Sequence, residues 1–121
     1  MAKTILVADD NPRIRKLLCQ MFETEHDYDL CAEATNGQEA IDLALTHRPD
    51  LIILDISMPV LNGIVAAREL KRLMPHVPII LFTQFASVGT DAFGPNPPFD
   101  RMVSKDDGKD LMGHIKSLIP V

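Results

Sequence analysis

The segment at residues 51–59 reads LIILDISMP. Its first four residues are large and aliphatic, which is typical of a central strand of a parallel sheet, buried on both faces. Asp55 follows this run directly. A second apolar run, from Thr4 to Ala8, also ends at acidic residues, Asp9 and Asp10. Two buried strands that both end at aspartate predict an acidic site at one edge of a sheet.

Strand-like and helix-like segments alternate along the rest of the chain. The predicted strands cover residues 4–8, 28–34, 51–54, 77–82 and 100–104. Amphipathic stretches follow four of these strands, the last of them at residues 107–118, and three begin at a capping asparagine: Asn11, Asn36 and Asn62. Leu17 and Leu45 are expected on the buried faces of the first two helices. This alternation predicts a parallel sheet with helices on both faces.

Five such strands predict a doubly wound sheet. Right-handed crossovers, with the most apolar strands in the centre, favour the strand order 2-1-3-4-5. The chain has 121 residues and contains no linker, internal repeat or low-complexity tract. We therefore expect a single domain over residues 1–121.

Residues 85–100 fit this alternation poorly. A helix could occupy residues 86–92, but Pro95, Pro97 and Pro98 would interrupt a longer one. The expectation is a short or irregular helix followed by an extended loop.

Composition narrows the functional classes. Apolar residues make up 46% of the chain and charged residues 24%, an ordinary globular mixture. A net charge of −5 argues against nucleic-acid binding by this domain. No apolar run approaches the roughly 20 residues of a membrane helix, and no signal peptide is evident, so a cytoplasmic location is expected. Cys19 and Cys31 have no metal or redox spacing, and two reduced, buried thiols are expected.

Polar residues at the predicted strand ends point to a site. Ligands of doubly wound sheets bind outside the carboxyl ends of the strands. That edge would gather five residues: Asp9, Asp10, Asp55, Thr83 and Lys105. Three carboxylates repel one another unless a proton or a cation relieves them, and oxygen ligands with room for water suit Mg²⁺. A carboxylate beside Mg²⁺ and a lysine can act as a nucleophile toward a phosphoryl group.

Each of these residues also has an ordinary explanation when it is taken alone. The aspartate pair could favour a helix N-terminus, and Asp55 could belong to a turn. Thr83 could be a hydrogen-bonded hydroxyl at a strand end, and Lys105 a surface lysine. Their joint placement at four separate strand ends favours a functional site.

The motifs taken together resemble the receiver domain of two-component response regulators. They are ILVADDNP at residues 5–12, LIILDISMP at residues 51–59, Asn62-Gly63, Thr83 and Lys105. The resemblance covers essentially the whole chain, with matching intervals between the motifs. It implies a flavodoxin-like fold and a role in bacterial phosphorelay signalling. The chain would be a stand-alone receiver or the receiver of a regulator with a helix-turn-helix output domain.

The resemblance also implies how the acidic residues act. Asp55 would accept a phosphoryl group from a sensor histidine kinase or a phosphotransfer protein. Asp10, Asp55 and the backbone carbonyl of Ser57 would ligate Mg²⁺, and Asp9 would assist through water. The chain would not be an enzyme beyond its own phosphorylation and dephosphorylation.

The remaining motif residues would read out the phosphate. Lys105 would hold the phosphoryl oxygens, and Thr83 would move toward them and report that the site is phosphorylated. One hydrogen bond from Thr83 would favour one of two loop arrangements. The readout would be a changed surface over residues 86–92, 100–104 and 107–118.

Three positions and one segment depart from the family pattern. Met102 replaces the usual aromatic residue, so the usual ring rotation cannot occur. Asp106 replaces a cis-proline after Lys105, and since a cis bond to another residue costs about 3 kcal/mol, this bond is expected to be trans or strained. Gln84 replaces a small residue and could change the dephosphorylation rate. The segment from Gly94 to Pro98 makes the output surface unusual.

Three functions compete. The first is a phosphoacceptor that signals by protein contact, with an unknown downstream protein or output domain and with homodimerisation left open. The second is a receiver-like docking module that no longer switches. The third, a phosphohydrolase with an aspartate nucleophile, is disfavoured because such enzymes carry an aspartate where this chain has Ser57.

Overall fold

Five parallel strands form one sheet in the order β2-β1-β3-β4-β5, as predicted. The computed structural model describes residues 2–84 and 93–121. The strands are β1 (Lys3–Ala8), β2 (Tyr28–Ala34), β3 (Leu51–Leu54), β4 (Ile79–Thr83) and β5 (Arg101–Ser104).

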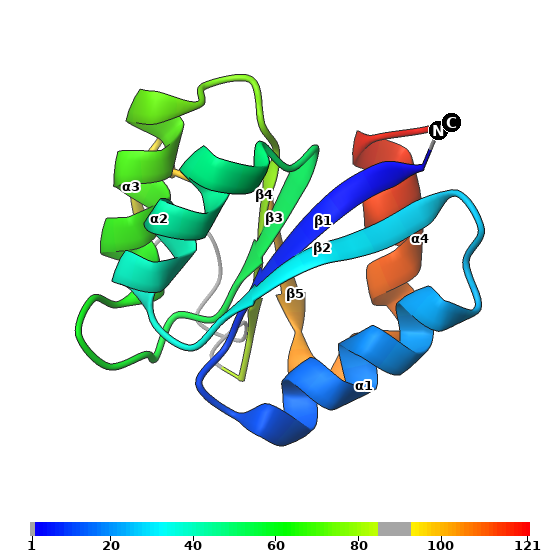
Figure 1. The fold of residues 1–121 in the computed structure, drawn as a ribbon. Coiled ribbons are helices and arrows are strands. Elements are labelled where there is room, and N and C mark those ends of the chain that lie inside the picture. The colour runs from blue at the N-terminus through cyan, green and yellow to red at the C-terminus, as the bar shows by residue number, and fades with distance from the viewer. Residues whose placement is uncertain (1, 85–92) are drawn as a thin grey trace.

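Helices cover both faces of the sheet (Figure 1). One face carries α1 (Pro12–Glu23) and α4 (Gly108–Leu118), and the other carries α2 (Gly37–His47) and α3 (Gly63–Leu73). A short 3₁₀ helix, η3 (Lys105–Asp107), leads into α4. Each face has its own apolar core: Leu18, Phe22, Leu111 and Ile115 belong to one, and Ala40, Ala44, Ala67 and Leu70 to the other.

The three predicted asparagine caps are confirmed. Asn11, Asn36 and Asn62 each accept a backbone N–H bond at the start of α1, α2 and α3. The Glu39 carboxylate reaches back to the N–H of Thr35, one residue before the cap. Each cap lies where the loop after β1, β2 or β3 enters the next helix. The caps therefore fix where three of the loops at one edge of the sheet end.

Some burial predictions are wrong. Leu17 is 60% exposed and Leu45 is 39% exposed, although the adjacent residues Leu18 and Ala44 are buried. Both leucines lie at the margin of the apolar face of their helix, which the sheet does not cover. Cys19 and Cys31 are free, as expected, but only partly buried. The exposed Leu17 leaves apolar surface on α1.

Element boundaries shift slightly. The fourth strand begins at Ile79 rather than Val77, since Pro78 has no N–H for the ladder. The helix expected at residues 86–92 lies outside the described residues. Residues 94–100 contain neither helix nor strand, consistent with the predicted loop. Among the described residues, no helix is both long and apolar enough to cross a bilayer.

Candidate functional site

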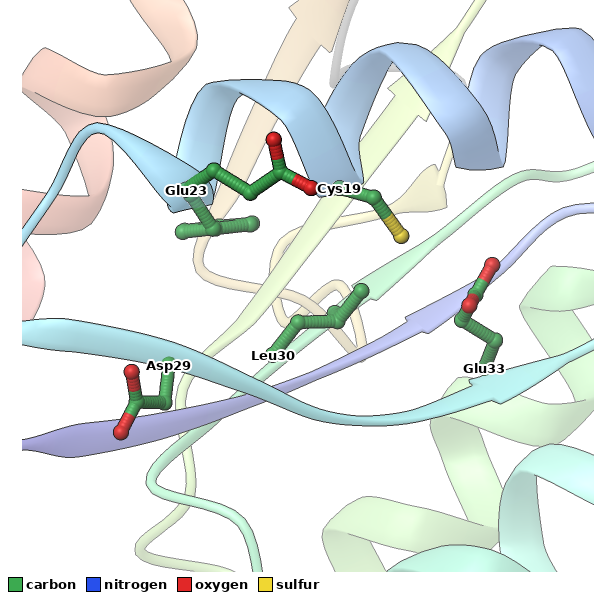
Figure 2. A pocket seen from close by; sticks show the side chains of 6 residues that line it. Cys19, Glu23, Asp29, Leu30 and Glu33 are labelled. Carbon is green, nitrogen blue, oxygen red and sulfur yellow. The ribbon is translucent and has the colours of Figure 1, made fainter.

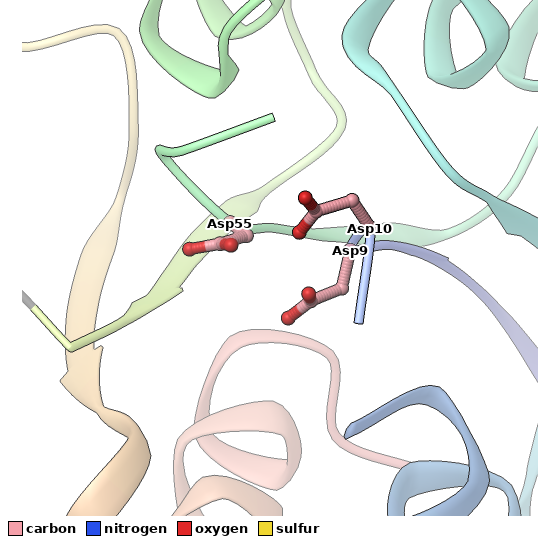
Figure 3. Close-up of side chains that lie close together, drawn as sticks. All are labelled: Asp9, Asp10 and Asp55. Atoms are coloured by element: carbon pink, nitrogen blue, oxygen red, sulfur yellow. The ribbon is translucent and has the colours of Figure 1, made fainter. Parts of the chain in front are cut away.

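The acidic residues after β1 and β3 converge. Ala8 pairs with Leu54 at the ends of these adjacent strands, so Asp9 and Asp55 leave the sheet side by side. One carboxylate oxygen from each of Asp9, Asp10 and Asp55 lies within 4.8 Å of the other two. Figure 3 shows the three side chains gathered where the two strands end.

The three carboxylates differ in exposure. Asp9 is 2% exposed and Asp55 is 6% exposed, whereas Asp10 is open to solvent. Two carboxylates are therefore withdrawn from water beside a third, an arrangement that favours binding of a cation or a proton.

Lys105 supplies the positive charge of this cluster. It follows β5 directly and extends its ammonium across the carboxyl ends of the strands. Its Nζ lies 2.8 Å from Asp9 Oδ2 and 3.3 Å from Asp55 Oδ2. The Lys105 side chain is only 9% exposed, so water screens these contacts weakly.

Burial and neighbouring charge shift two pKa values in the site. Burial raises the pKa of Asp55, the charge of Asp9 raises it further, and Lys105 opposes both. Burial alone would lower the pKa of Lys105, but its hydrogen bonds and charge contacts with Asp9 and Asp55 outweigh this effect and raise it. Lys105 thus stays protonated at neutral pH.

A hollow of about 190 Å³ opens beside these groups. Its lining residues are Asp10, Asn11, Asp55, Ser57, Gln84 and Lys105. The donor atoms are oxygens, and an exposed carboxylate leaves room for water, so the site fits a small hard cation such as Mg²⁺. Gln84, noted in the sequence as a departure, therefore faces the same space as Asp55.

Thr83 occupies a different position from the other site residues. It is wholly buried as the last residue of β4, paired in the ladder with Ser104, and is not among the described residues that line the hollow. Ser104 immediately precedes Lys105, so the ends of β4 and β5 place Thr83 close to the lysine that contacts Asp55.

Gly63 supports the site in a way the sequence did not reveal. Its N–H donates to the carbonyl of Ile56 at 2.8 Å, and a Cβ at this position would overlap the carbonyl oxygen of Asp55. The sequence indicated only a turn at Asn62-Gly63. Asn11, another residue whose part in the site was missed, lines the hollow and donates its N–H to Asp9 Oδ1 at 2.9 Å.

The departures at residues 102 and 106 leave the backbone regular. No peptide bond among the described residues is cis, so the Lys105–Asp106 bond is trans, one of the two expected outcomes. Met102 is partly buried and packs against the core shared with α2 and α3.

Comparison with known proteins accounts for this arrangement. The family model of the response regulator receiver domain matches residues 5–116. The chain belongs to this family. The sequence motifs predicted a receiver domain of two-component response regulators, and the family match confirms this prediction.

Several relatives carry such a receiver domain within longer proteins. The chain is 34% identical over 116 residues to a protein-glutamate methylesterase/protein-glutamine glutaminase of Clostridium acetobutylicum, covering 85% of this chain and 34% of that protein. It is 43% identical over 84 residues to the transcriptional regulatory protein PdtaR of Mycobacterium tuberculosis, covering 68% of this chain and 40% of that protein. The chain thus spans well under half the length of these curated relatives.

Solved structures agree with the fold. The response regulator TrrA from Thermotoga maritima, in complex with Mg²⁺-BeF, is 35% identical and superposes with a TM-score of 0.85 over 97% of this chain and 99% of that chain. The response regulator domain of Thermotoga maritima CheB superposes with a TM-score of 0.89 over 100% and 98% of the two chains; at 22% identity it supports the fold alone.

Proposed function

We propose that this receiver domain is a phosphorylation-dependent signalling switch and that Asp55 is its phosphoacceptor. The observation that carries the proposal is the position of the Asp55 carboxylate, which faces a solvent-connected hollow between Lys105 and two further carboxylates. A structural ion pair would need neither the additional carboxylates nor the hollow.

The acidic cluster would hold Mg²⁺. Asp10, Asp55 and the backbone carbonyl of Ser57 would be its protein ligands, and Asp9 would act through water. Bound there, the ion would offset negative charge on the phosphoryl oxygens. The related TrrA, solved with Mg²⁺-BeF, supports this choice of cation.

Phosphorylation would be a direct displacement at phosphorus. A carboxylate oxygen of Asp55 forms the new O–P bond while the P–N bond of a phosphohistidine donor breaks, and the imidazole leaves with the bonding pair and takes up a proton. Lys105 is placed to donate hydrogen bonds to the phosphoryl oxygens, and its raised pKa keeps it charged while it does so. Gln84, at the same hollow, would affect the access of water to the acyl phosphate.

The signal would travel through Thr83 and β5. A phosphoryl group adds charge and strong acceptors, and a hydrogen bond from the Thr83 hydroxyl would favour one of two local arrangements. Because Thr83 pairs with Ser104, a shift at the end of β4 would reach β5 and Lys105. The changed surface would include β5 and α4.

A sensor histidine kinase or phosphotransfer protein would dock beside the site. An apolar hollow of about 230 Å³ adjoins Lys105, lined by Ile14, Leu17, Leu18, Met21, Phe82, Lys105 and Gly108. Leu17→Glu should slow transfer from whichever kinase phosphorylates the wild type most efficiently, while transfer from acetyl phosphate stays unchanged. Leu45→Glu, an equivalent change on α2, is the control; equal rates for both variants would contradict this docking site.

Intact mass tests the proposed function directly. The protein is incubated with acetyl phosphate and Mg²⁺, beside Asp55→Asn and a metal-free sample. We expect a gain of one phosphoryl group that requires both Asp55 and Mg²⁺. A gain that persists in Asp55→Asn would refute the assignment of the acceptor.

The competing function is a docking module that no longer switches. Met102, in place of an aromatic residue, is the observation that favours it. A change in partner affinity or oligomeric state on phosphorylation would support the switch, and identical behaviour of the phosphorylated and unphosphorylated protein would support the docking module.

A further inference from the structure

Four contacts fix the position of Asp9, three from its backbone and carboxylate to neighbouring groups and one from Arg15. Its N–H donates to the carbonyl of Ala34 at 3.0 Å, and its Oδ1 accepts from the N–H of Asn11 at 2.9 Å. Its Oδ2 contacts Lys105. Its own carbonyl oxygen accepts a 2.7 Å hydrogen bond from Nη1 of Arg15, a residue of α1 that neither the motifs nor the resemblance singled out.

Arg15 bridges α1, the Asp9 carbonyl and β2. Its Nε lies 3.4 Å from Oε1 of Glu33, while its Nη1 reaches Asp9. Figure 2 shows Glu33 extending from β2 toward α1, at the rim of the groove that also contains Cys19. Glu33 precedes Ala34, the residue that accepts the Asp9 N–H. The guanidinium therefore joins the first turn after β1 to the end of β2.

The bond at the Asp9 carbonyl matters most for Asp10. This carbonyl belongs to the peptide unit that joins the two aspartates, and a peptide unit is planar, so fixing its oxygen also fixes the orientation of the Asp10 N–H. Asp9 is buried and has three other contacts, but Asp10 is exposed and gains little from packing. The direction in which Asp10 leaves the backbone thus depends strongly on this peptide.

We propose that Arg15 is a positioning residue that aims the Asp10 carboxylate at the cation site by holding the Asp9–Asp10 peptide, with Glu33 holding the guanidinium. The inference rests on the proposed function in that Asp10 is taken to bind Mg²⁺. Arg15 touches neither the cation nor the phosphoryl group in this arrangement. Its effect comes from hydrogen-bond geometry, since a planar guanidinium can serve two acceptors in fixed directions.

Arg15→Met tests the proposal because it keeps much of the aliphatic stem and removes the guanidinium. Arg13→Met is the matched control: Arg13 is exposed on the same helix, and its loss removes the same charge. We expect Arg15→Met to weaken Mg²⁺ binding, measured by calorimetry, by roughly tenfold, the lower end of the range for groups that orient metal ligands. Arg13→Met should change it by less than about twofold, because screened surface charge acts weakly.

A second readout needs no metal. The Asp10 N–H lies in the peptide that Arg15 holds, so the ¹H–¹⁵N NMR signal of this amide in metal-free protein should shift in Arg15→Met and stay close to its wild-type position in Arg13→Met. Arg15→Lys, which keeps the charge but lacks the fork, should fall between wild type and Arg15→Met in both measurements. This variant also serves if Arg15→Met does not fold.

The outcomes separate the two proposals. Equal Mg²⁺ affinity and an unshifted Asp10 amide signal in both the Arg15 and the Arg13 variants would overturn the role of Arg15, even if Arg15→Met had a lower melting temperature. If the wild type binds no Mg²⁺ and accepts no phosphoryl group, the proposed function fails. The NMR signal of the Asp10 amide then decides alone whether Arg15 holds the peptide.

Discussion

Gly63 packs so tightly against Asp55 that the backbone carbonyl of Asp55 occupies the space a side chain at residue 63 would need. We expect Gly63→Ala to lower the free energy of unfolding by about 1–3 kcal/mol, the usual cost of overpacking a rigid contact. It should also slow phosphorylation, because the backbone that carries Asp55 must shift. Urea unfolding and intact mass after acetyl phosphate treatment measure the two effects.

Gly113 provides the control for this change. It lies in α4 with open space where a Cβ would be, so Gly113→Ala should raise stability by up to about 1 kcal/mol through helix propensity. If both alanine variants were equally stable, the contact between Gly63 and Asp55 would not be rigid.

Asp55→Asn should stabilise the metal-free protein at neutral pH. Burial and the charge of Asp9 raise the pKa of Asp55 in spite of Lys105, so the ionised carboxylate disfavours the folded state. Removing its charge should raise the free energy of unfolding by roughly 0.5–2 kcal/mol, as for other stabilising replacements. Asp29→Asn, at an exposed position of β2, is the charge-matched control and should have little effect.

The pH dependence of this difference follows from the raised pKa. Below the unfolded-state pKa of aspartate, about 3.9, Asp55 is protonated in both states and the advantage of Asp55→Asn vanishes. It grows as pH rises from there to the raised folded-state pKa and is complete above it. Unfolding curves of both proteins across this window check the sign, and a difference that grew toward acid pH would contradict it.

Lys105→Met should separate cation binding from phosphoryl transfer. Without the ammonium between Asp9 and Asp55, the cluster is more negative and should bind Mg²⁺ several-fold more tightly. Phosphorylation by acetyl phosphate should nevertheless fall by roughly 10²–10³-fold, the usual cost of losing a group that stabilises transferring charge. Calorimetry and intact mass over time measure the two quantities.

An exposed lysine on α4 provides the comparison. Lys109→Met should leave Mg²⁺ affinity and phosphorylation close to wild type. If Lys105→Met lost Mg²⁺ binding and phosphorylation together, Lys105 would chiefly maintain the folded site.

Val60→Gly should stabilise the loop between β3 and α3. Val60 has φ +67°. It is the middle residue of a tight turn in which the N–H of Leu61 donates to the carbonyl of Pro59 at 2.7 Å. A β-branched residue is strained there, and since Val60 is 81% exposed, little packing is lost with its side chain. We expect the free energy of unfolding, measured with urea, to rise by roughly 0.5–1 kcal/mol. This is the strain relieved in the folded state minus the cost of the greater freedom that glycine gives the unfolded chain.

Val65→Gly tests whether that gain is specific to the turn. Val65 is exposed in α3, so glycine there should instead cost up to about 1 kcal/mol. A loss of stability in both variants would mean that the turn at Val60 is not strained.

Local patterns were sufficient for the elements and for the position of the site. The apolar run at residues 51–54 and the alternation around it predicted the sheet and its strand order, which the structure confirms. The asparagine caps were predictable because a cap acts on its own helix within three residues. The exposure of Leu17 was missed because periodicity identifies an apolar stripe but not how wide a face the sheet will cover.

The amino-acid sequence by itself determined that three aspartates and a lysine would end neighbouring parallel strands, because strand ends in such a sheet share one edge. Only the tertiary structure decided which atoms meet there: that Lys105 contacts both Asp9 and Asp55, that Gly63 abuts the Asp55 carbonyl, and that Arg15 holds the peptide before Asp10. These contacts join segments distant in sequence or depend on one side-chain rotamer. Strand register and helix placement determine these contacts, and neither can be predicted from local sequence patterns.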